Sequence, residues 1–364
     1  MHAKPKVGIV YLPFYHNDDF SSRAFSSIAS QDYPKEALHT YVVNNPHWEL
    51  GSYVPRLQEL AQQTPGIPAV TFMATGKNLG FSGGNNVGIK RALEDACDYV
   101  MILNDDAFLA RDCLSQLVGA MEADPTIAEA QPVIALYPDT QLVNSAGNAL
   151  HLLGFGYSLG YKQPVTEWLN RGVRDVAYVS GAIAIFRADL LRVHGLMEEA
   201  FFMYHEDTEL SLRYALRGYR TACVSDALGF HAYHFLRNKK ALEWMERSRY
   251  TILLLTYKLP TLILLLPALI GTEIALWFFA LKGGWIREKW RASTAWLRPQ
   301  TWRTWLPKRA EHQRKRTVTD GVLLKRLTGQ IDFQEQAQQH WLVRRLANPV
   351  LSAYLKALQL VVWW

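Results

Sequence analysis

Residues 99–106 read YVMILNDD, and this stretch decides how the rest of the chain is interpreted. Five apolar residues in a row fit a buried strand, and the polar triplet Asn104-Asp105-Asp106 follows at once. A second acidic pair, Glu206-Asp207, follows another apolar run about a hundred residues later. Carboxylates crowded at the end of a buried segment lose hydration and repel one another, unless a cation or a proton-transfer role compensates. We therefore expect one cluster to bind a divalent metal and the other to act as a general base.

Apolar strands alternate with helical patterns in the first part of the chain. The strands are predicted at residues 7–12, 40–43, 69–73 and 99–103, and the helices at 21–31, 57–62 and 86–96. This order predicts an α/β fold with a doubly wound, mostly parallel sheet. Ligands of such sheets bind beyond the carboxyl ends of the strands, where Asn44, Gly80 and Asp106 are all expected.

The pattern changes after about residue 125. A long apolar run at 176–186 is interrupted by Ser180-Gly181-Ala182, and a helix is predicted at 208–217 with Gly218 as its C-terminal cap. We expect a catalytic domain over residues 1–250, with a donor side at about 5–125 and an acceptor side at about 126–250, followed by a helical region over 251–364.

The stretch NLGFSGGNN, residues 78–86, is rich in glycine and lies between a predicted strand and a predicted helix. Its glycines allow backbone amides to approach a ligand closely, and the N-terminus of the following helix favours a diphosphate. The stretch is not a Walker loop, because no Gly-Lys-Ser/Thr ends it, and it lacks the spacing of a dinucleotide fingerprint.

The three cysteines, Cys97, Cys113 and Cys223, lack the spacing of metal ligands. We expect them to be buried thiols in a reducing compartment. The apolar run at 7–12 is too short for the core of a signal peptide. The catalytic part is therefore expected in the cytoplasm.

The positive charge of the chain is concentrated in one segment. The net charge is +6, but residues 282–326 hold thirteen Lys and Arg against three acidic residues, which leaves about −4 for the rest. Tryptophans interleave with basic residues in this segment and just before it, at Trp277, Trp285, Trp290, Trp296, Trp302 and Trp305. Tryptophan together with basic residues is typical of an anionic membrane surface, so we expect this region to associate with a membrane.

An apolar stretch at 259–281 contains one charged residue, Glu273. Its length would nearly span a bilayer, but Pro260, Pro267 and Gly271 interrupt it, and a carboxylate is costly at mid-membrane. We expect two short apolar helices that enter the membrane or lie in its interface, with a single span and a soluble buried hairpin as the alternatives. The amphipathic segment at 341–364 is either a membrane anchor or a dimer helix.

Taken together, these motifs resemble those of the family 2 glycosyltransferases, which have the GT-A fold. The resemblance covers about residues 5–250 and rests on SIASQDYP at 27–34, NLGFSGGNN at 78–86, DYVMILNDDAFL at 98–109 and the tract from GAIAIF to RGYR at 181–220. The basic, tryptophan-rich C-terminal part is similar to that of rhamnosyltransferases that act on lipid-diphosphate-linked sugars.

The resemblance implies a nucleotide-sugar donor, a divalent metal (Mg²⁺ or Mn²⁺) and inversion at the anomeric carbon. Asp106 stands at the position of the family's metal ligand. Asn104 replaces the family's first Asp and would contact the ribose or a metal-bound water. His231, or His234 as the alternative, matches a second metal ligand.

The resemblance also assigns the acid–base residues. Asp207 matches the family's catalytic base, which takes the proton of the attacking acceptor hydroxyl. Glu206 beside it would orient the acceptor or tune the base.

The donor site is expected at the ends of the first strands and at the glycine stretch. The family usually has an Asp after the second strand, where this chain has Asn44, whose amide can still pair with a pyrimidine. The residues assigned to donor binding are Pro13, Phe14, Tyr15, Asn44, Asn78, Gly80, Gly83, Gly84, Asn85, Asn104 and Asp105.

The acceptor site is expected on the other side. Ser180 and Gly181 match the family's acceptor-side floor, with Trp168 placed near it. Basic side chains after the histidine are expected to hold a lipid diphosphate, and they are Arg237, Lys239, Arg247 and Arg249.

We therefore expect a metal-dependent, inverting glycosyltransferase on the cytoplasmic face of the inner membrane, peripheral or monotopic. The expected donor is dTDP-L-rhamnose, and the expected acceptor is a polyprenyl-diphosphate-linked sugar, such as GlcNAc-diphosphate-polyprenol, in cell-envelope polysaccharide synthesis. No nucleic-acid partner is expected, and a homodimer stays open.

Two alternatives remain at this point, another family 2 enzyme with a UDP-sugar donor and a catalytically inactive membrane scaffold. A processive synthase is disfavoured because the sequence has no Gln-x-x-Arg-Trp motif. A nucleotidyltransferase is disfavoured because the sequence has no Gly-x-Gly-Thr-Arg loop.

Overall fold

The structure is a computed structural model of the 364-residue chain, and it describes all residues except 1–3, 15, 47–51, 234–238 and 333–340. The chain forms two compact units. Unit 1 comprises residues 1–148, 158–211 and 220–233, and unit 2 comprises residues 149–157, 212–219 and 234–364. Tyr15, Arg237 and the alternative ligand His234 lie outside the described residues.

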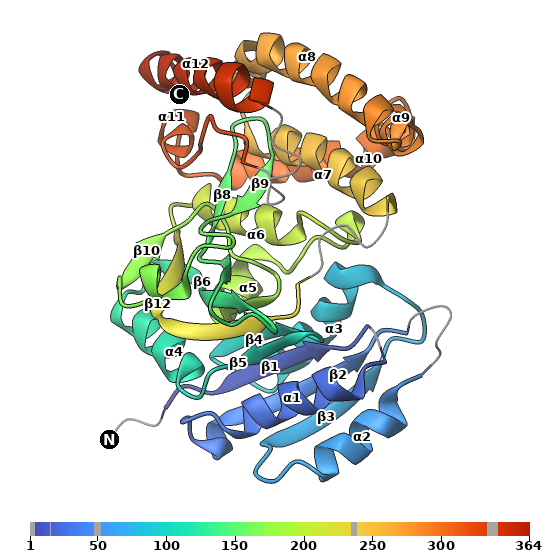
Figure 1. Cartoon of the computed structure of the whole chain (residues 1–364), viewed down its shortest axis with the longest axis vertical. Coiled ribbons are helices and arrows are strands. Elements are labelled where there is room, and N and C mark those ends of the chain that lie inside the picture. The colour runs from blue at the N-terminus through green and yellow to red at the C-terminus, as the bar shows by residue number, and fades with distance from the viewer. Residues whose placement is uncertain (1–3, 15, 47–51, 234–238, 333–340) are drawn as a thin grey trace. The chain divides into compact units, whose positions relative to one another are not determined.

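A ten-stranded mixed sheet is the centre of unit 1 (Figure 1). Its strands follow the order β10-β12-β6-β11-β4-β1-β2-β3, with β5 paired to β12 and β7 paired to β6. The bounds are β1 Val7–Leu12, β2 Leu38–Asn44, β3 Ala69–Ala74, β4 Tyr99–Asn104, β5 Ala107–Leu109, β6 Ile127–Leu136, β7 Val143–Ser145, β10 Val173–Asp175, β11 Ile183–Arg187 and β12 Arg220–His231.

Strands β1 to β4 confirm the predicted parallel sheet, because β1 pairs in parallel with both β2 and β4, and β2 pairs in parallel with β3. In the other half only β12 and β6 are parallel, and the remaining pairings are antiparallel. Parallel neighbours need a long crossover, usually a helix, and the strand–helix alternation of the sequence stops near residue 125. The mostly parallel sheet is thus a property of the first half.

The helices described in this part of the chain are α1 Asp18–Ala29, α2 Val54–Gln62, α3 Gly80–Glu94, α4 Cys113–Ala123, α5 Ala188–His194 and α6 Glu206–Ala215. The last turn of α6 belongs to unit 2. Helix α1 begins earlier than predicted, because Oδ1 of Asn17 accepts a hydrogen bond from the N–H of Phe20 at 3.0 Å and caps the helix. Cys97, Cys113 and Cys223 are buried free thiols, as predicted.

The glycines Gly83 and Gly84 lie inside helix α3 and not in a turn before it, which corrects the sequence prediction. A Cβ on Gly84 would lie 2.7 Å from a methyl group of Leu12. A Cβ on Gly88 would lie 2.4 Å from a methyl group of Val10. These glycines therefore allow α3 to pack closely against β1, where a phosphate cradle was expected.

Unit 2 consists mainly of helices. The bounds are α7 Lys240–Thr256, α8 Leu259–Lys282, α9 Ile286–Ala295, α10 Pro299–Lys315, α11 Asp320–Leu324 and α12 Asn348–Val361, with a π-helical turn at Val343–Ala347. A two-stranded sheet is formed by β8 (Asn148–Leu150) and β9 (Gly156–Ser158).

Helix α8 is continuous, so the prediction of two short apolar helices is wrong. Pro260 lies in the first turn, where its missing N–H costs no helical hydrogen bond. Pro267 does remove one, and the hydroxyl of Tyr354 in α12 donates to the carbonyl oxygen of Leu264 in the preceding turn. Among the described residues, α8 is the one helix long and apolar enough to cross a membrane.

A buried cluster of charges explains the carboxylate in this apolar helix. Glu273 contacts Arg249 and Tyr250 of α7, and its Oε2 lies 2.7 Å from Nζ of Lys289 in α9. Glu246 of α7 accepts from the same two cations, at 2.6 Å from Lys289 and 3.1 Å from Arg249. The side chains of Lys289 and Arg249 are 0% and 2% exposed. Arg249 is therefore a structural cation of unit 2, which corrects its assignment to the acceptor site.

Candidate active site

Asp106 and His231, the two assigned metal ligands, lie side by side in unit 1. Strands β5 and β12 pair antiparallel with Ala107 opposite His231. The N–H of Ala232 also donates to the carbonyl oxygen of Asp106 at 2.9 Å. Nε2 of His231 is 3.0 Å from Oδ1 of Asp106. Nδ1 of the same ring is 3.0 Å from Oδ1 of Asn144. Strand pairing thus brings together two residues that are far apart in the sequence.

The contact with Asn144 decides what the imidazole of His231 presents to Asp106. An amide oxygen only accepts hydrogen bonds, so the proton of a neutral ring is on Nδ1 and the lone pair of Nε2 faces the carboxylate. Two acceptors at this distance repel unless a proton or a cation compensates. The pair therefore fits a metal site, with Asn144 as the outer partner that orients the ring.

A metal held by this pair would need further ligands. Within the described part of the chain, no group of three or more His, Cys, Asp or Glu side chains gathers in a way that could hold a metal. Divalent cations bound by one or two carboxylates commonly complete their shell with substrate phosphates and water. The two protein ligands thus fit a metal that is shared with a diphosphate.

The second acidic pair lies at the start of α6. Oδ2 of Asp207 accepts a hydrogen bond from the backbone N–H of Gly181 at 3.0 Å, and Oδ1 accepts one from the N–H of Thr208 at 2.6 Å. Such donors stabilise the ionised carboxylate. The residue is only half-buried. Asp207 is therefore fixed in orientation while still exposed in part.

Glu206 has different surroundings. Its side chain is buried, and its Oε2 has no hydrogen-bond partner among the described residues. Burial raises the pKa of Glu206 well above its ordinary value, and the charge of Asp207 raises it further. Burial also raises the pKa of Asp207, but the hydrogen bonds from Gly181 and Thr208 oppose that rise. The pair therefore keeps a proton on Glu206 more readily than on Asp207, which leaves Asp207 as the carboxylate.

The segment 180–182 links the two acidic clusters. The N–H of Asn104 donates to the carbonyl oxygen of Ala182 at 3.0 Å, one residue from the Gly181 N–H that holds Asp207. The N–H of Ser180 donates to Oε1 of the buried Gln131 at 2.8 Å. The structure thus brings together Asn104, Gly181 and Asp207, which were assigned separately from the sequence.

Asp105 contacts the segment that follows β1. Its Oδ2 accepts a hydrogen bond from the N–H of Phe14 at 3.0 Å, and its carbonyl oxygen accepts one from the hydroxyl of Tyr11 at 3.3 Å. Phe14 and Pro13 belong to the segment assigned to the nucleoside. Asp105 therefore shapes this segment through the backbone.

Asn45 contacts the glycine stretch and is a residue that the sequence analysis left out. Its Oδ1 accepts from the N–H of Leu79 at 2.8 Å, and its Nδ2 donates to the carbonyl oxygen of Gly80 at 3.0 Å. Its neighbour Asn44 is buried, with Nδ2 3.4 Å from the hydroxyl of Ser52. The side chain of Asn45 therefore holds the start of α3 to the end of β2. The sequence signal for this role was a second Asn directly after the one that ends the strand.

The first amides of α3 have partners within the protein. The carbonyl oxygen of Phe202 accepts from the N–H of Phe81 at 2.7 Å and from that of Ser82 at 3.4 Å. Oδ1 of Asn78 accepts from the N–H of Gly80 at 2.8 Å. These are the N–H groups that a helix start leaves unpaired. In this conformation α3 does not present them to a diphosphate, which corrects the expectation from the glycine stretch.

The segment that provides this carbonyl is strained. Phe202, Tyr204 and His205 have φ angles of 65°, 69° and 71°. Such angles cost a non-glycine residue about 1–3 kcal/mol and are kept mainly at functional sites. The segment leads directly into Glu206-Asp207 and so connects the start of α3 with the acidic pair.

Three assigned residues contact neighbours in the fold. Nδ2 of Asn85 donates to the carbonyl oxygen of Phe81 at 3.0 Å within α3, and a Cβ on Gly83 would lie 2.8 Å from Cβ of Leu79. The ring of Trp168 stacks on Arg174, with 4.6 Å from the guanidinium carbon to the ring centroid. These contacts fix the three residues in the fold.

Two of the basic residues assigned to the acceptor remain candidates in unit 2. Nζ of Lys239 donates to the carbonyl oxygen of Gly284 at 2.8 Å and is exposed. Arg247 is half-buried.

The comparisons with known proteins identify the family. The glycosyl transferase family 2 model matches residues 9–194, which is just over half of the chain. The chain therefore belongs to glycosyl transferase family 2 and is a glycosyltransferase. The suspected family of the sequence analysis is confirmed.

Within the family the chain resembles rhamnosyltransferases. It is 25% identical over 248 residues to "Rhamnosyltransferase WbbL" of Escherichia coli (strain K12), covering 61% of this chain and 88% of that protein. It is 27% identical over 182 residues to "N-acetylglucosaminyl-diphospho-decaprenol L-rhamnosyltransferase" of Mycobacterium tuberculosis (strain ATCC 25618 / H37Rv), covering 45% of this chain and 59% of that protein. The chain thus matches most of the first relative and less than two thirds of the second.

A solved structure confirms the fold. The crystal structure of GalNAc-T7 with UDP, GalNAc and Mn²⁺ matches with a TM-score of 0.54 at 13% identity, covering 69% of this chain and 50% of that chain. The fold is therefore the predicted GT-A fold, with a mixed central sheet.

Proposed function

We propose that this chain transfers L-rhamnose from dTDP-L-rhamnose to a polyprenyl-diphosphate-linked sugar, such as GlcNAc-diphosphate-polyprenol, with inversion at the anomeric carbon. The relatives named as rhamnosyltransferases support the sugar and the lipid acceptor. One observation carries the chemistry. A half-buried carboxylate, Asp207, is held in place by two backbone N–H groups, and segment 180–182 links it to the strand that ends before Asp106.

In this proposal Asp207 is the base. A single displacement needs a group that accepts the proton of the acceptor hydroxyl as its oxygen attacks the anomeric carbon. Asp207 fits because the hydrogen bonds from Gly181 and Thr208 favour its ionised form. Oδ1 also accepts from the hydroxyl of Thr208 at 3.2 Å, so Oδ2 is the oxygen proposed to take the proton. Glu206 is a weaker candidate, since it is buried and its raised pKa favours the protonated form.

Gly181 forms the floor beside this base. A Cβ at this position would lie 3.2 Å from the ring of Phe81 and 3.5 Å from Oδ2 of Asp207. A side chain there would occupy the space next to the carboxylate. The proposal therefore places the acceptor hydroxyl over Gly181 and gives Ser180 a place at the edge of the same floor.

Asp106 and His231 would hold the divalent cation of the donor. When bound, the cation would neutralise the charge that develops on the leaving diphosphate. Oxygen ligands suit Mg²⁺ and Mn²⁺, whereas an imidazole ligand is less suited to Mg²⁺ than to transition metals. We therefore favour Mn²⁺ over Mg²⁺.

The donor nucleotide would lie along the strand ends of the parallel half. Asn44, Asp105 and the segment at Pro13 and Phe14 would contact the nucleoside, with Asn104 near the ribose. The hydrogen bond from the N–H of Phe14 to Oδ2 of Asp105 supports this, because it orders the segment next to the end of β4. Asn78 would lie on the side of the donor sugar.

Unit 2 would provide the lipid side. Residues 282–326 carry the excess positive charge, and Lys239 and Arg247 are the basic side chains proposed for the acceptor diphosphate. A lipid acceptor requires a membrane, and we place the enzyme on the cytoplasmic face of the inner membrane as a peripheral or monotopic protein.

The test is a transfer assay with the full chain and Mn²⁺, with dTDP-L-rhamnose or UDP-sugars as donors and GlcNAc-diphosphate-polyprenol in detergent as acceptor. We expect a lipid product with the mass of one added deoxyhexose from dTDP-L-rhamnose, and its loss with EDTA. Asp207→Asn is the matched inactive control. Transfer from a UDP-sugar alone would overturn the donor, and no transfer or donor hydrolysis by wild type would favour the inactive scaffold.

A further inference from the structure

Helix α8 exposes an uninterrupted apolar face along its whole length. Its exposed apolar side chains recur every three or four residues, which is the spacing of one helix face. They are between 49% and 69% exposed, and they are Leu259, Ile263, Leu266, Ile270, Ile274, Phe278 and Leu281. Only 6% of the most apolar window of this helix is buried. Monomeric soluble proteins rarely leave such a surface in water.

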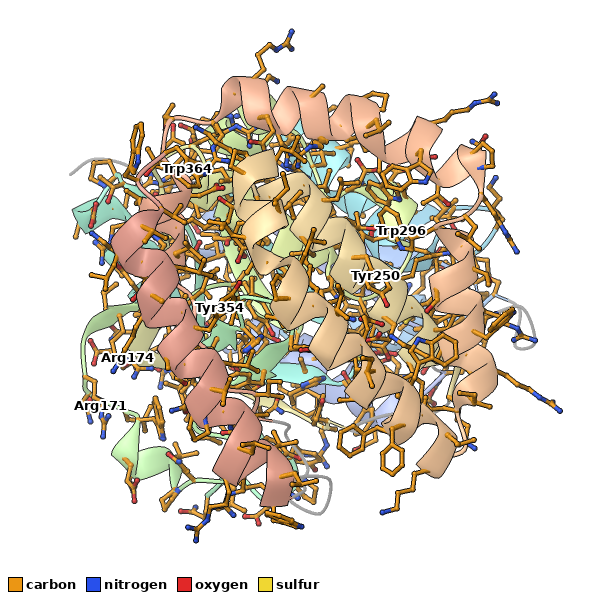
Figure 2. All side chains as sticks on the ribbon, turned by 90° about the horizontal axis from the view of Figure 1, so that it is seen from above. Arg171, Arg174, Tyr250, Trp296, Tyr354 and Trp364 are labelled. Atoms are coloured by element: carbon orange, nitrogen blue, oxygen red, sulfur yellow. The ribbon has the colours of Figure 1, made fainter. Side chains whose placement is uncertain are left out.

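The opposite face of α8 is tied to unit 2 at several points. Near its start, the indole Nε1 of Trp364 donates to the hydroxyl of Thr261 at 3.0 Å. One turn further, Tyr354 of α12 donates to a carbonyl oxygen of α8, and Figure 2 shows α8 and α12 side by side. In the middle, Glu273 contacts Arg249 and Lys289 of the buried charge cluster. Near its end, Ala280 is fully buried.

These ties oppose a transmembrane arrangement. At about 1.5 Å per residue, the 24 residues of α8 are long enough to cross a bilayer. To cross it, however, the helix would have to leave α7 and α9. That would expose the buried cations Lys289 and Arg249 and take the carboxylate of Glu273 into lipid without them. The helix keeps its partners only if one face alone enters the membrane.

We infer that α8 lies in the plane of an anionic membrane as a monotopic helix, with the face from Leu259 to Leu281 immersed and the face of Glu273 kept on the protein. The partner is a lipid surface. Trp290, exposed on the neighbouring helix α9, and Trp302, exposed on the following helix α10, are suited to the headgroup level.

Charge favours lipid over a second copy of the chain. The segment 282–326, which directly follows α8, carries ten more basic than acidic residues, thirteen against three. Two copies meeting face to face would bring these segments together and repel one another. Anionic headgroups are attracted by the same charge.

This inference concerns the lipid partner of the proposed function, but it rests on unit 2 alone and needs no sugar substrate for its test. Single cysteines replace Ile263, Ile270 and Phe278 in the full chain and are labelled with a nitroxide. The accessibility of each label to oxygen and to a polar nickel complex gives its depth in vesicles of phosphatidylethanolamine and phosphatidylglycerol. We expect one shallow depth at all three positions. A label depth that is greatest at position 270 and shallow at positions 263 and 278 would show that α8 spans the membrane, and this would overturn the inference.

A second measurement tests the partner. We expect wild type to float with these vesicles and to be released by salt, and Ile270→Glu with Ile274→Glu to stay in solution. Val193→Glu, an equally exposed apolar site on α5 of unit 1, is the matched control and should float like wild type. If the labels stay exposed to water and the chain sediments as a dimer, the partner of this face is a second copy of the chain and not a lipid surface. The variant with Ile270→Glu and Ile274→Glu should still hydrolyse the donor in the absence of lipid. The inference and the proposed function can therefore fail separately.

Discussion

The backbone N–H of Gly181 donates to Oδ2 of Asp207 at 3.0 Å, so the floor of the candidate site orients the candidate base directly. In the same segment, the carbonyl oxygen of Ala182 accepts a hydrogen bond from the N–H of Asn104. The end of β4 and the start of α6 are therefore held together by two consecutive residues, Gly181 and Ala182, and not by contact between the acidic side chains.

The first prediction concerns this base. Asp207→Asn keeps the shape of the side chain but cannot accept the proton, so we expect kcat to fall by about 10²–10⁴-fold. The dissociation constant of the nucleotide sugar should stay the same, because Asp207 is proposed to serve the acceptor only. Transfer kinetics and isothermal titration with the donor measure the two effects. Retained transfer would remove Asp207 from the mechanism.

The pH profile of the wild type gives a related check. The pKa of Asp207 is raised by burial, and the base must be ionised to act. The value of kcat/KM should therefore fall as the pH drops through a pKa above that of an ordinary aspartate. A profile that stays flat down to the ordinary aspartate range would contradict the assignment.

The second prediction concerns the stability contributed by Glu206. Its folded pKa lies well above 4.5, so the folded chain binds more protons than the unfolded chain between these two values. Stability should then fall as the pH rises through this window. Glu206→Gln removes the charge, and its melting temperature should exceed that of wild type at pH 8 and approach it below pH 4.5. An equal difference at every pH would mean that the substitution acts through packing instead.

The sequence predicts the parallel half of the sheet and the pairing of Asp106 with His231. It predicts less well the contacts that hold the elements of the site in position. Buried strands are apolar runs, and acidic residues at their ends stand out. Asn144 and the carbonyl of Phe202 act through single contacts between segments that are far apart in the chain. A backbone carbonyl leaves no signature in the residue type, so such a contact cannot be found by motif.

The glycine stretch was misplaced for a different reason. Glycine serves both close approach to a ligand and close packing of a helix, and residue type alone does not separate the two. The spacing of Gly80, Gly84 and Gly88 at four residues was the available signal for a helix face. Helix α8 was likewise predicted as two helices because of its prolines, although its apolar residues recur with regular helical spacing. In the structure, Tyr354 of α12 donates a hydrogen bond to α8 in the turn before Pro267.

The third prediction concerns Asn144 and the metal. Asn144→Leu removes the acceptor that fixes the imidazole of His231, and we expect the affinity for Mn²⁺ to fall by about 10–100-fold. Asn144→Asp keeps an acceptor at the same place and should bind Mn²⁺ nearly as wild type does. Both are measured by the loss of the free Mn²⁺ signal in electron paramagnetic resonance. If the leucine variant binds Mn²⁺ as tightly as wild type, the imidazole is not a ligand.

The fourth prediction concerns the packing of α3. Gly88→Ala places a methyl group 2.4 Å from a methyl of Val10, so we expect a loss of about 1–3 kcal/mol in the free energy of unfolding. Gly119→Ala in α4 is the matched control, since nothing lies within 4 Å of its added Cβ, and it should gain up to about 1 kcal/mol. Denaturant titrations followed by circular dichroism measure both. Equal effects would mean that α3 yields to the added methyl group.

The fifth prediction concerns the buried charge cluster of unit 2. Burial alone would raise the pKa of Glu246, but Arg249 and Lys289 lower it to about 2. The unfolded value is 4.5, so the ionised form contributes stability above that pH, and this contribution is lost as the pH falls from 4.5 towards about 2. At about 1.4 kcal/mol per pKa unit the contribution is on the order of 3 kcal/mol. Glu246→Gln should lose a similar amount at neutral pH.

The control for this cluster is an exposed ion pair in the same unit. Glu311 lies 2.7 Å from Lys315 in α10, with half of its side chain exposed. Glu311→Gln should therefore cost less than about 1 kcal/mol. Ten of the twelve tryptophans lie in residues 234–364, so tryptophan fluorescence during urea unfolding reports on unit 2. If the two variants lose equal stability, the buried cluster adds nothing beyond a surface pair, and α8 must be held to unit 2 by apolar packing and by its hydrogen bonds with Trp364 and Tyr354.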